Sequence, residues 1–129
     1  MPERFEVDPG ASPATNCVAL TGRLISAPAV RDLPSGDQIV TFRLSVARSR
    51  TAMTARSKAA SDWVDCTAWT ARTRRTVSRW QVGDRVEVQG ALRRRFYAAA
   101  AGSGTRLEVE VLQARRCARR GEDRAPSVD

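Results

Sequence analysis

One stretch of nine residues decides how this chain folds: Ser61-Asp62-Trp63-Val64-Asp65-Cys66-Thr67-Ala68-Trp69. In a β-strand, successive side chains point to opposite faces, so the stretch separates into two sets. One set is small and apolar and fits a core: Val64, Cys66, Ala68. The other set faces water and holds both tryptophans: Trp63, Asp65, Thr67, Trp69. Because exposed tryptophan is uncommon and unstacked bases bind flat aromatic surfaces, this outer face is a candidate nucleic-acid surface.

Period-two alternation continues on both sides of this stretch and predicts further strands. We expect strands over 16–24, 39–48, 61–69, 85–97 and 106–111. A turn is expected over 33–37, since Pro34 presets φ and Gly36 tolerates a positive φ. A short helix is predicted over 71–81, ending before Gly83, and a loop of small residues over 98–104.

The element order is therefore β-β-β-α-β-β. It predicts an all-β fold with one short helix, a five-stranded Greek-key barrel of the OB type. An SH3-like barrel is the main alternative, with a smaller helical element and shorter strands. Phe42 and Phe96 share faces with aliphatic neighbours and are predicted core residues. Trp80 is predicted to plug the bottom of the barrel.

The length of 129 residues fits one domain, which we place at 16–117 between disordered tails at 1–15 and 118–129. The sequence shows no apolar run long enough to span a membrane and no secretory leader, so we expect a cytoplasmic protein without membrane contact. Three widely spaced cysteines argue against a disulfide framework: Cys17, Cys66, Cys117.

Basic residues outnumber acidic ones, 22 against 14, for a net charge of +8. Such a field favours a polyanionic partner, and phosphate is the commonest one in a cell. A GC-rich coding sequence would explain why Lys58 is the one lysine among many arginines. It would not explain the excess of basic over acidic residues, so the polyanion interpretation is preferred.

Catalysis is not expected from this composition. The chain has no histidine, which removes Ser-His-Asp triads, histidine acid–base chemistry and most zinc hydrolase sites. It also has no Cys-x-x-Cys pair for a metal. Asp62 and Asp65 lie on opposite strand faces and do not converge on a cation. We therefore expect no catalytic residues, no metal and no cofactor.

A series of short segments resembles the bacterial single-stranded DNA-binding protein family in order and spacing. The segments are Leu20-Thr21-Gly22-Arg23-Leu24 within 16–24, Pro34-Ser35-Gly36, Thr41-Phe42-Arg43-Leu44 within 40–47, Asp62-Trp63-Val64 within 62–69, and Val82-Gly83-Asp84 with Gly90-Ala91-Leu92 within 82–93. The resemblance covers about residues 16–113. It implies an OB fold that wraps single-stranded DNA around a homotetramer, although a dimer stays open.

The resemblance also assigns roles by position. It implies that Trp63, Trp69 and Tyr97 stack on bases. A further stacking position of some members falls on Arg50, whose guanidinium can also stack on a base. Two features depart from the family pattern. Three arginines occupy the helix where leucine and valine normally pack: Arg72, Arg74, Arg75.

The second departure is at the carboxyl end, where 121–129 lacks the acidic, hydrophobic tip that recruits replication partners. We therefore expect a paralogue-like member without that recruitment, or a divergent member carried on a mobile element. Arginines on outer strand faces are candidates for phosphate contacts: Arg43, Arg93, Arg95. Basic residues of the 49–61 loop are expected to fold over a bound strand: Arg50, Arg56, Lys58.

The predicted function is therefore sequence-independent binding of single-stranded DNA in replication, recombination or repair. Two alternatives stay open from the residues. One is an OB-fold adaptor of the primosomal type, in which the aromatics bury against a protein. The other is an RNA-binding module, since stacking does not distinguish the sugar.

Overall fold

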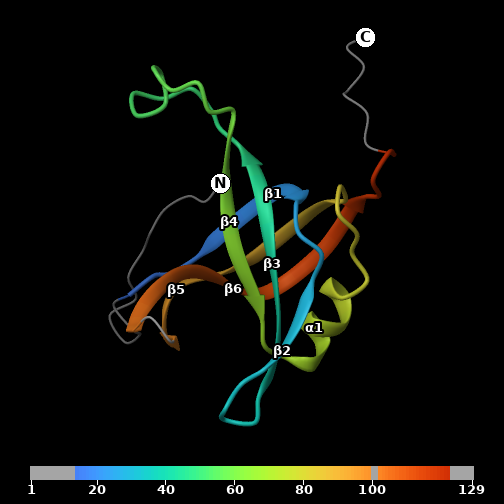
Figure 1. Ribbon diagram of the computed structural model, residues 1–129. Helices are drawn as coiled ribbons and strands as arrows, with labels where there is room; N and C mark the ends of the chain where they lie inside the picture. Colours follow the sequence, from blue (N-terminus) through green and yellow to red (C-terminus); the bar gives the residue numbers. More distant parts are fainter. Residues whose placement is uncertain (1–13, 100–101, 123–129) are drawn as a thin grey trace.

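Six β-strands and one short helix make up the described part of the chain, residues 14–99 and 102–122 of this computed structural model (Figure 1). The elements are β1 (Val18–Leu24), β2 (Ala29–Asp32), β3 (Gln38–Ala47), β4 (Ser61–Ala68), α1 (Ala71–Val77), β5 (Arg85–Ala99) and β6 (Gly102–Ala118). Residues 1–13 and 123–129 lie outside the described residues, and so does most of each predicted tail.

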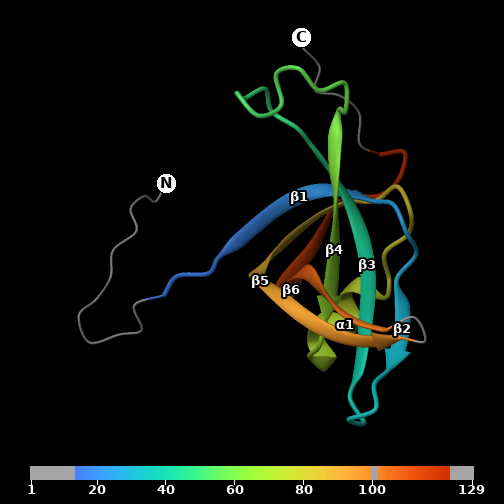
Figure 2. The same ribbon diagram turned by 60° about the vertical axis from the view of Figure 1, so that its left-hand side comes forward.

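Five of these strands close into a ring (Figures 1 and 2). The sheet runs β1-β5-β6-β4-β3-β2, and an additional pairing of β1 with β3 joins the ring. All of the pairings are antiparallel except that of β4 with β6. The predicted all-β fold with one short helix is confirmed. Its strand β2 was not predicted, because all four residues are exposed and show no alternation.

Strand β1 serves both sides of the closure because it bends from one partner to the other. Its residues Val18–Arg23 pair with β5, while Arg23 and Leu24 pair with β3. At the bend, a Cβ on Gly22 would overlap the carbonyl oxygen of Ser45 on β3. The close approach of β1 to β3 therefore requires glycine at this position.

The core lies inside the ring and is built from alternating apolar side chains. The predicted inner faces of the second and third expected strands are confirmed. The buried cluster consists of Leu24, Val40, Phe42, Leu44, Cys66, Ala68, Val77, Trp80, Val86, Val88, Val109 and Val111. Since these residues point inward, their sequence neighbours on β3 and β4 form the outer surface.

Helix α1 closes one end of the ring, and its three arginines do not prevent docking. Thr70 caps its start by accepting a hydrogen bond from the Thr73 N–H. Arg74 donates to the Gln38 carbonyl at 2.6 Å, while Val77 is buried in the core. Arg74 thus hydrogen-bonds to the backbone at the start of β3, while Val77 at the end of the helix packs in the core.

The helix ends at Val77, four residues before its predicted end at position 81. The next turn is tighter, with the Trp80 N–H donating to the Val77 carbonyl. This turn places Trp80 in the core, where its ring meets Phe42 edge to face at 5.4 Å. The predicted core role of Trp80 is confirmed.

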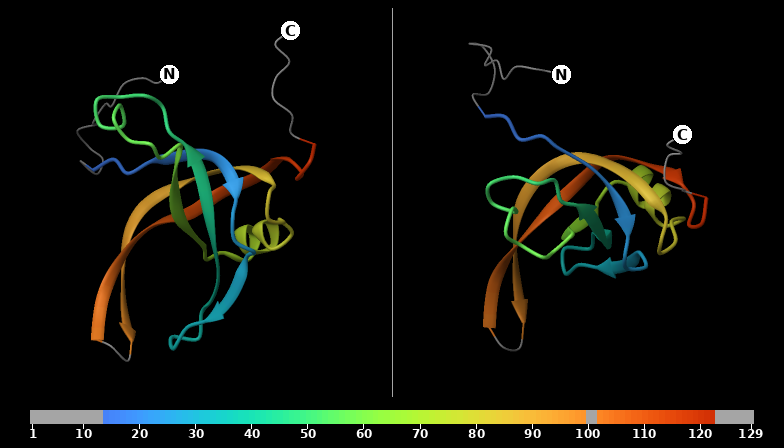
Figure 3. Two further views of the ribbon diagram at one scale, coloured as in Figure 1. Left: turned by 45° about the horizontal axis from the view of Figure 1, so that its top comes forward. Right: turned by 90° about the horizontal axis from the view of Figure 1, so that it is seen from above.

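Strands β5 and β6 continue past the ring as a hairpin arm, which projects from the molecule in Figure 3. Ala98 and Ala99 pair with Ser103 and Gly102, so most of the predicted 98–104 loop is strand. The prediction that Phe96 belongs to the core is wrong: it is 78% exposed. Phe96 does share the alternation of the core residues of β5, but no strand within 14–99 and 102–122 lies opposite the arm to cover that face.

Asp84 fastens the start of β5 to the end of β6. Its Oδ2 accepts from the Gln81 N–H at 2.8 Å and its Oδ1 from the Arg120 N–H at 2.9 Å. Arg116 lies 3.6 Å from the same carboxylate. Burial acts to raise the pKa of Asp84, but the two N–H groups and Arg116 together hold the pKa below its ordinary value.

Asp84→Asn should lower the free energy of unfolding by about 1–3 kcal/mol at pH 7, because an amide group cannot accept both N–H bonds and loses the ion pair. The depressed pKa means that this contribution is present above the pKa of unfolded aspartate and is lost as the pH falls through the folded pKa. Urea unfolding of both proteins should therefore converge in acid. Asp32→Asn on exposed β2 is the control, and an equal loss there would contradict the assignment.

Candidate nucleic-acid interface

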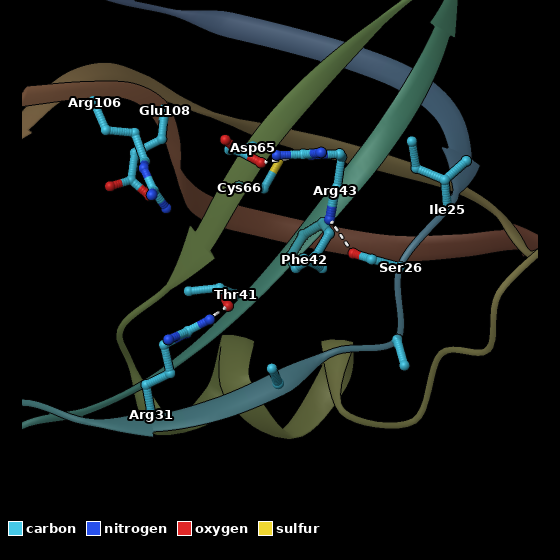
Figure 4. A pocket seen from close by; sticks show the side chains of 12 residues that line it. Ile25, Ser26, Arg31, Thr41, Phe42, Arg43, Asp65, Cys66, Arg106 and Glu108 are labelled. Carbon is cyan, nitrogen blue, oxygen red and sulfur yellow. Dashed lines mark hydrogen bonds and ion pairs between the residues drawn. The ribbon is translucent and has the colours of Figure 1, made fainter.

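An outer groove follows the wet faces of β3 and β4 and continues between β2 and β6. It consists of three adjoining hollows with volumes of about 380, 260 and 260 Å³. The largest lies over Arg43 and Asp65, and Figure 4 shows its lining. Glu108 is shared with the hollow beside Trp69, and Arg31 and Arg106 with the hollow at the β2–β3 turn.

Trp63 lies on the outer face of β4, as predicted, and is 61% exposed. The Arg43 guanidinium carbon lies 3.9 Å from the centroid of its ring. The register explains this contact, because β3 pairs Arg43 with Asp65 and Ser45 with Trp63, which makes Arg43 and Trp63 diagonal neighbours. The geometry is that of a cation–π pair.

Arg43 is held at its backbone and at its side chain. Its N–H donates to the Ser26 hydroxyl at 2.9 Å, and its carbonyl accepts from the Ile25 N–H at 2.9 Å. Its Nε donates to Asp65 Oδ1 at 2.9 Å, as Figure 4 shows. The residue predicted as a phosphate contact is thus engaged with a carboxylate and an indole.

Trp69 follows β4 and lines the second hollow together with arginines of β5 and acids of β6. It is partly exposed, and its carbonyl accepts from Arg74 at 3.1 Å. Trp69 therefore lines the outer groove, while Trp63 contacts Arg43, which lines the groove at another point.

Thr67 was expected in water, and this expectation is wrong: it is 1% exposed. Its hydroxyl donates to the carboxylate of Glu108, which is itself buried and also accepts from Arg95 Nε. The cause is the parallel pairing of β4 with β6, which brings Glu108 over the outer face of β4, while the pairing of β6 with β5 brings Arg95 to Glu108. Alternation placed Thr67 on the correct face but could not show this cover.

Arg93 and Arg95, the other predicted phosphate contacts on strands, both line the second hollow. Arg93 pairs with Glu110 at 3.0 Å, and Arg95 pairs with Glu108. A phosphate that reached either guanidinium would have to displace the glutamate already paired with it, or share the guanidinium with that glutamate. The electrostatic attraction between this hollow and a polyanion is therefore weaker than the number of arginines suggests.

The groove residues missed from the sequence include Arg31, Thr41, Arg94 and Arg106. Arg31 Nε donates to Thr41 Oγ1 at 3.4 Å across the β2–β3 hairpin. The sequence did not indicate Arg31, because β2 shows no alternation of buried and exposed residues that would predict a strand. It did indicate Arg106, since Arg106 alternates with the inward-facing residues of the last predicted strand.

Four predicted residues are not brought into the groove by the described structure. Arg50, Arg56 and Lys58 are exposed on the loop between β3 and β4, which extends beyond the ring in Figure 1. The backbone of Tyr97 pairs with Gly104 on the arm, while its side chain lies outside the described residues. The stacking role of Tyr97 and the loop contacts stay predictions.

The three cysteines are free. Burial, with the charges of Asp65 and Glu108, raises the pKa of the Cys66 thiol to about 12, so it is a core residue rather than a nucleophile. Among residues 14–99 and 102–122, no cluster of three or more acidic or cysteine side chains could hold a metal ion. No helix in these ranges is long and apolar enough to cross a membrane.

A five-stranded closed ring of this strand order, with an arginine-lined outer groove and an exposed indole, has the architecture of an OB fold. Comparison with known proteins agrees and is more specific. Residues 15–116 match the model of the single-strand binding protein family, so the chain belongs to that family.

Two relatives illustrate the match. Over 99 residues the chain is 31% identical to single-stranded DNA-binding protein A of Bacillus subtilis strain 168, covering 77% of this chain and 55% of the relative. The chain thus spans about half the length of that relative. The structure of Plasmodium falciparum SSB in complex with ssDNA matches with a TM-score of 0.64 at 22% identity, over 84% of this chain and 97% of the other. That likeness supports the fold.

Proposed function

We propose that this protein binds single-stranded DNA without sequence preference, through the outer groove. The observation that carries the proposal is Trp63, a largely exposed indole in contact with Arg43, which lines the outer groove of an OB fold. Membership of the single-strand binding protein family supports it, as does the printed name of the Bacillus subtilis relative.

Stacking explains why binding should tolerate any sequence. Every base has a π face, and each stacked base contributes about 1–3 kcal/mol. Trp63 and Trp69 supply two such platforms, and we propose Tyr97 as a third. A duplex keeps its bases stacked inside the helix, so these platforms favour single strands.

Phosphate contacts supply the remaining affinity in this proposal. The groove carries Arg31, Arg95 and Arg106 at the hollows between β2 and the arm. We propose Arg93, Arg50, Arg56 and Lys58 as additional contacts. Since released counterions contribute to such binding, the affinity should fall as salt rises.

The proposal extends to assembly and cellular role. Membership of this family supports a homo-oligomer, for which we propose a tetramer, with a dimer as the alternative. We further propose a cytoplasmic protein without catalytic activity that acts in replication, recombination or repair. The free cysteines suit a reducing compartment.

The proposal is tested by titrating the protein into labelled dT oligonucleotide, labelled oligo-U and labelled duplex, with anisotropy as the readout. We expect the dT strand to bind tightly, the duplex weakly, and both affinities to fall as salt rises. Tight binding of oligo-U with weak binding of dT would favour the RNA-binding module. Failure of all three to bind would contradict the proposal and favour the adaptor.

A further inference from the structure

We propose that Arg43 and Asp65 are a positioning pair for Trp63: Arg43 covers one face of the indole, so that a single base stacks on the opposite face. This inference rests on the proposed function, because it concerns how the same groove receives the strand. It assigns to Arg43 a role other than the phosphate contact predicted from the sequence.

The geometry of the Trp63 ring carries the first step. The Arg43 guanidinium carbon lies 3.9 Å from the ring centroid, within van der Waals contact of the π face. Even with this face covered, Trp63 remains 61% exposed. With one face against Arg43, the opposite face and the ring edges are the parts that a base would contact.

Asp65 carries the second step, because it fixes the guanidinium that lies on the ring. Its Oδ1 accepts from Arg43 Nε at 2.9 Å, and its side chain is 20% exposed. A guanidinium is planar and can donate from its edge while its face rests on an indole. A lysine ammonium has the same charge but no such plane.

This arrangement holds Trp63 in place before a strand arrives. Less side-chain freedom is then lost when a base stacks, which improves affinity without any added contact to the strand. Asp65 therefore supports binding even though its own charge repels phosphate. Charge alone would predict that Asp65 lowers the affinity for DNA, whereas we expect it to raise that affinity.

Two aspartates on β4 distinguish positioning of Trp63 by Asp65 from a general effect of negative charge on DNA affinity. Asp62 pairs at 3.0 Å with Arg48, which directly follows β3. Asp62 lies three positions before Asp65 and on the opposite face of β4. We expect Asp65→Ala to weaken dT binding by about twofold to fivefold, as expected for loss of a held cation–π contact. Asp62→Ala should leave the affinity unchanged or raise it, because it removes a negative charge and releases Arg48 while the Arg43–Trp63 contact stays in place.

Arg43→Lys provides the second measurement and keeps the charge of the site. Its dT affinity should fall by about twofold to fivefold, with an unchanged slope of log affinity against log salt. If Arg43 instead contacted phosphate, lysine would maintain the affinity, and Arg43→Ala would reduce that slope by about 0.7. Thermal melting of each variant verifies that the fold is intact.

Failure of the positioning pair and failure of single-strand binding give different results. Wild-type affinity in Arg43→Lys, or affinity equal to or above wild type in Asp65→Ala, would overturn the positioning pair while leaving single-strand binding in place. Absence of dT binding by the wild-type protein would overturn the proposed function, and the positioning pair with it.

Discussion

Trp63→Ala is expected to weaken the binding of a dT oligonucleotide by between about fivefold and about 150-fold, since a stacking aromatic contributes about 1–3 kcal/mol per base. The folded state should change little, because Trp63 lies outside the buried cluster. Anisotropy of labelled dT gives the affinity, and thermal melting confirms the fold.

A second exposed aromatic provides the control for this prediction. Phe96 is more exposed than Trp63, but it lies on the face of the arm opposite to the one that carries Arg93 and Arg95. Phe96→Ala should therefore leave dT affinity unchanged. Wild-type affinity in the double variant Trp63→Ala, Trp69→Ala would contradict base stacking and favour an adaptor whose aromatics bury against a protein.

Gly90→Ala is expected to have the largest effect on stability, about 3 kcal/mol or more. A Cβ on Gly90 would overlap the carbonyl oxygen of Glu110 and press on the N atom of Leu112. These are backbone atoms of β6, so relief requires β5 and β6 to separate where they pair within the ring. Urea unfolding, or loss of the folded protein, measures the effect.

The matched control is Gln89→Ala, one position earlier on the same strand with an exposed side chain. Its free energy of unfolding should change by less than about 0.5 kcal/mol. A Gly90→Ala protein as stable as Gln89→Ala would show that β5 and β6 are less closely packed than described.

Alternation predicted the faces of β3 and β4 correctly because those strands have one buried and one wet side. Val40 and Leu44 are buried, and Trp63 is exposed. Alternation predicts the face on which a side chain lies, but not whether another strand buries that face. Thr67 shares the outer face with Trp63 but lies beneath Glu108, which comes from a strand 41 positions away in sequence.

The extents of the elements were harder to predict, for physical reasons that differ. Strand β2 has no buried side, so it produces no alternation. The arm keeps the alternation of a core strand beyond the point at which the ring ends, which is why Phe96 resembled a core residue. The helix was overestimated because Trp80 had to leave helical geometry to reach the core.

The candidate site was predicted in part for the same reasons. Trp63, Arg43, Arg93 and Arg95 were found because alternation identifies outer residues. Their ion pairs with Asp65, Glu110 and Glu108 were not, because pairing depends on the register between strands. The cover of one Trp63 face by Arg43 follows from that register and from no feature of either residue alone.

The central claim is that single-stranded DNA stacks on Trp63 in the outer groove. The most direct measurement is the intrinsic tryptophan fluorescence of the wild-type protein and of Trp63→Ala during titration with poly(dT). We predict that poly(dT) quenches the wild-type emission, that added salt restores it, and that much of the quenching is absent in Trp63→Ala. Wild-type emission that stays unchanged at saturating poly(dT) would contradict the account.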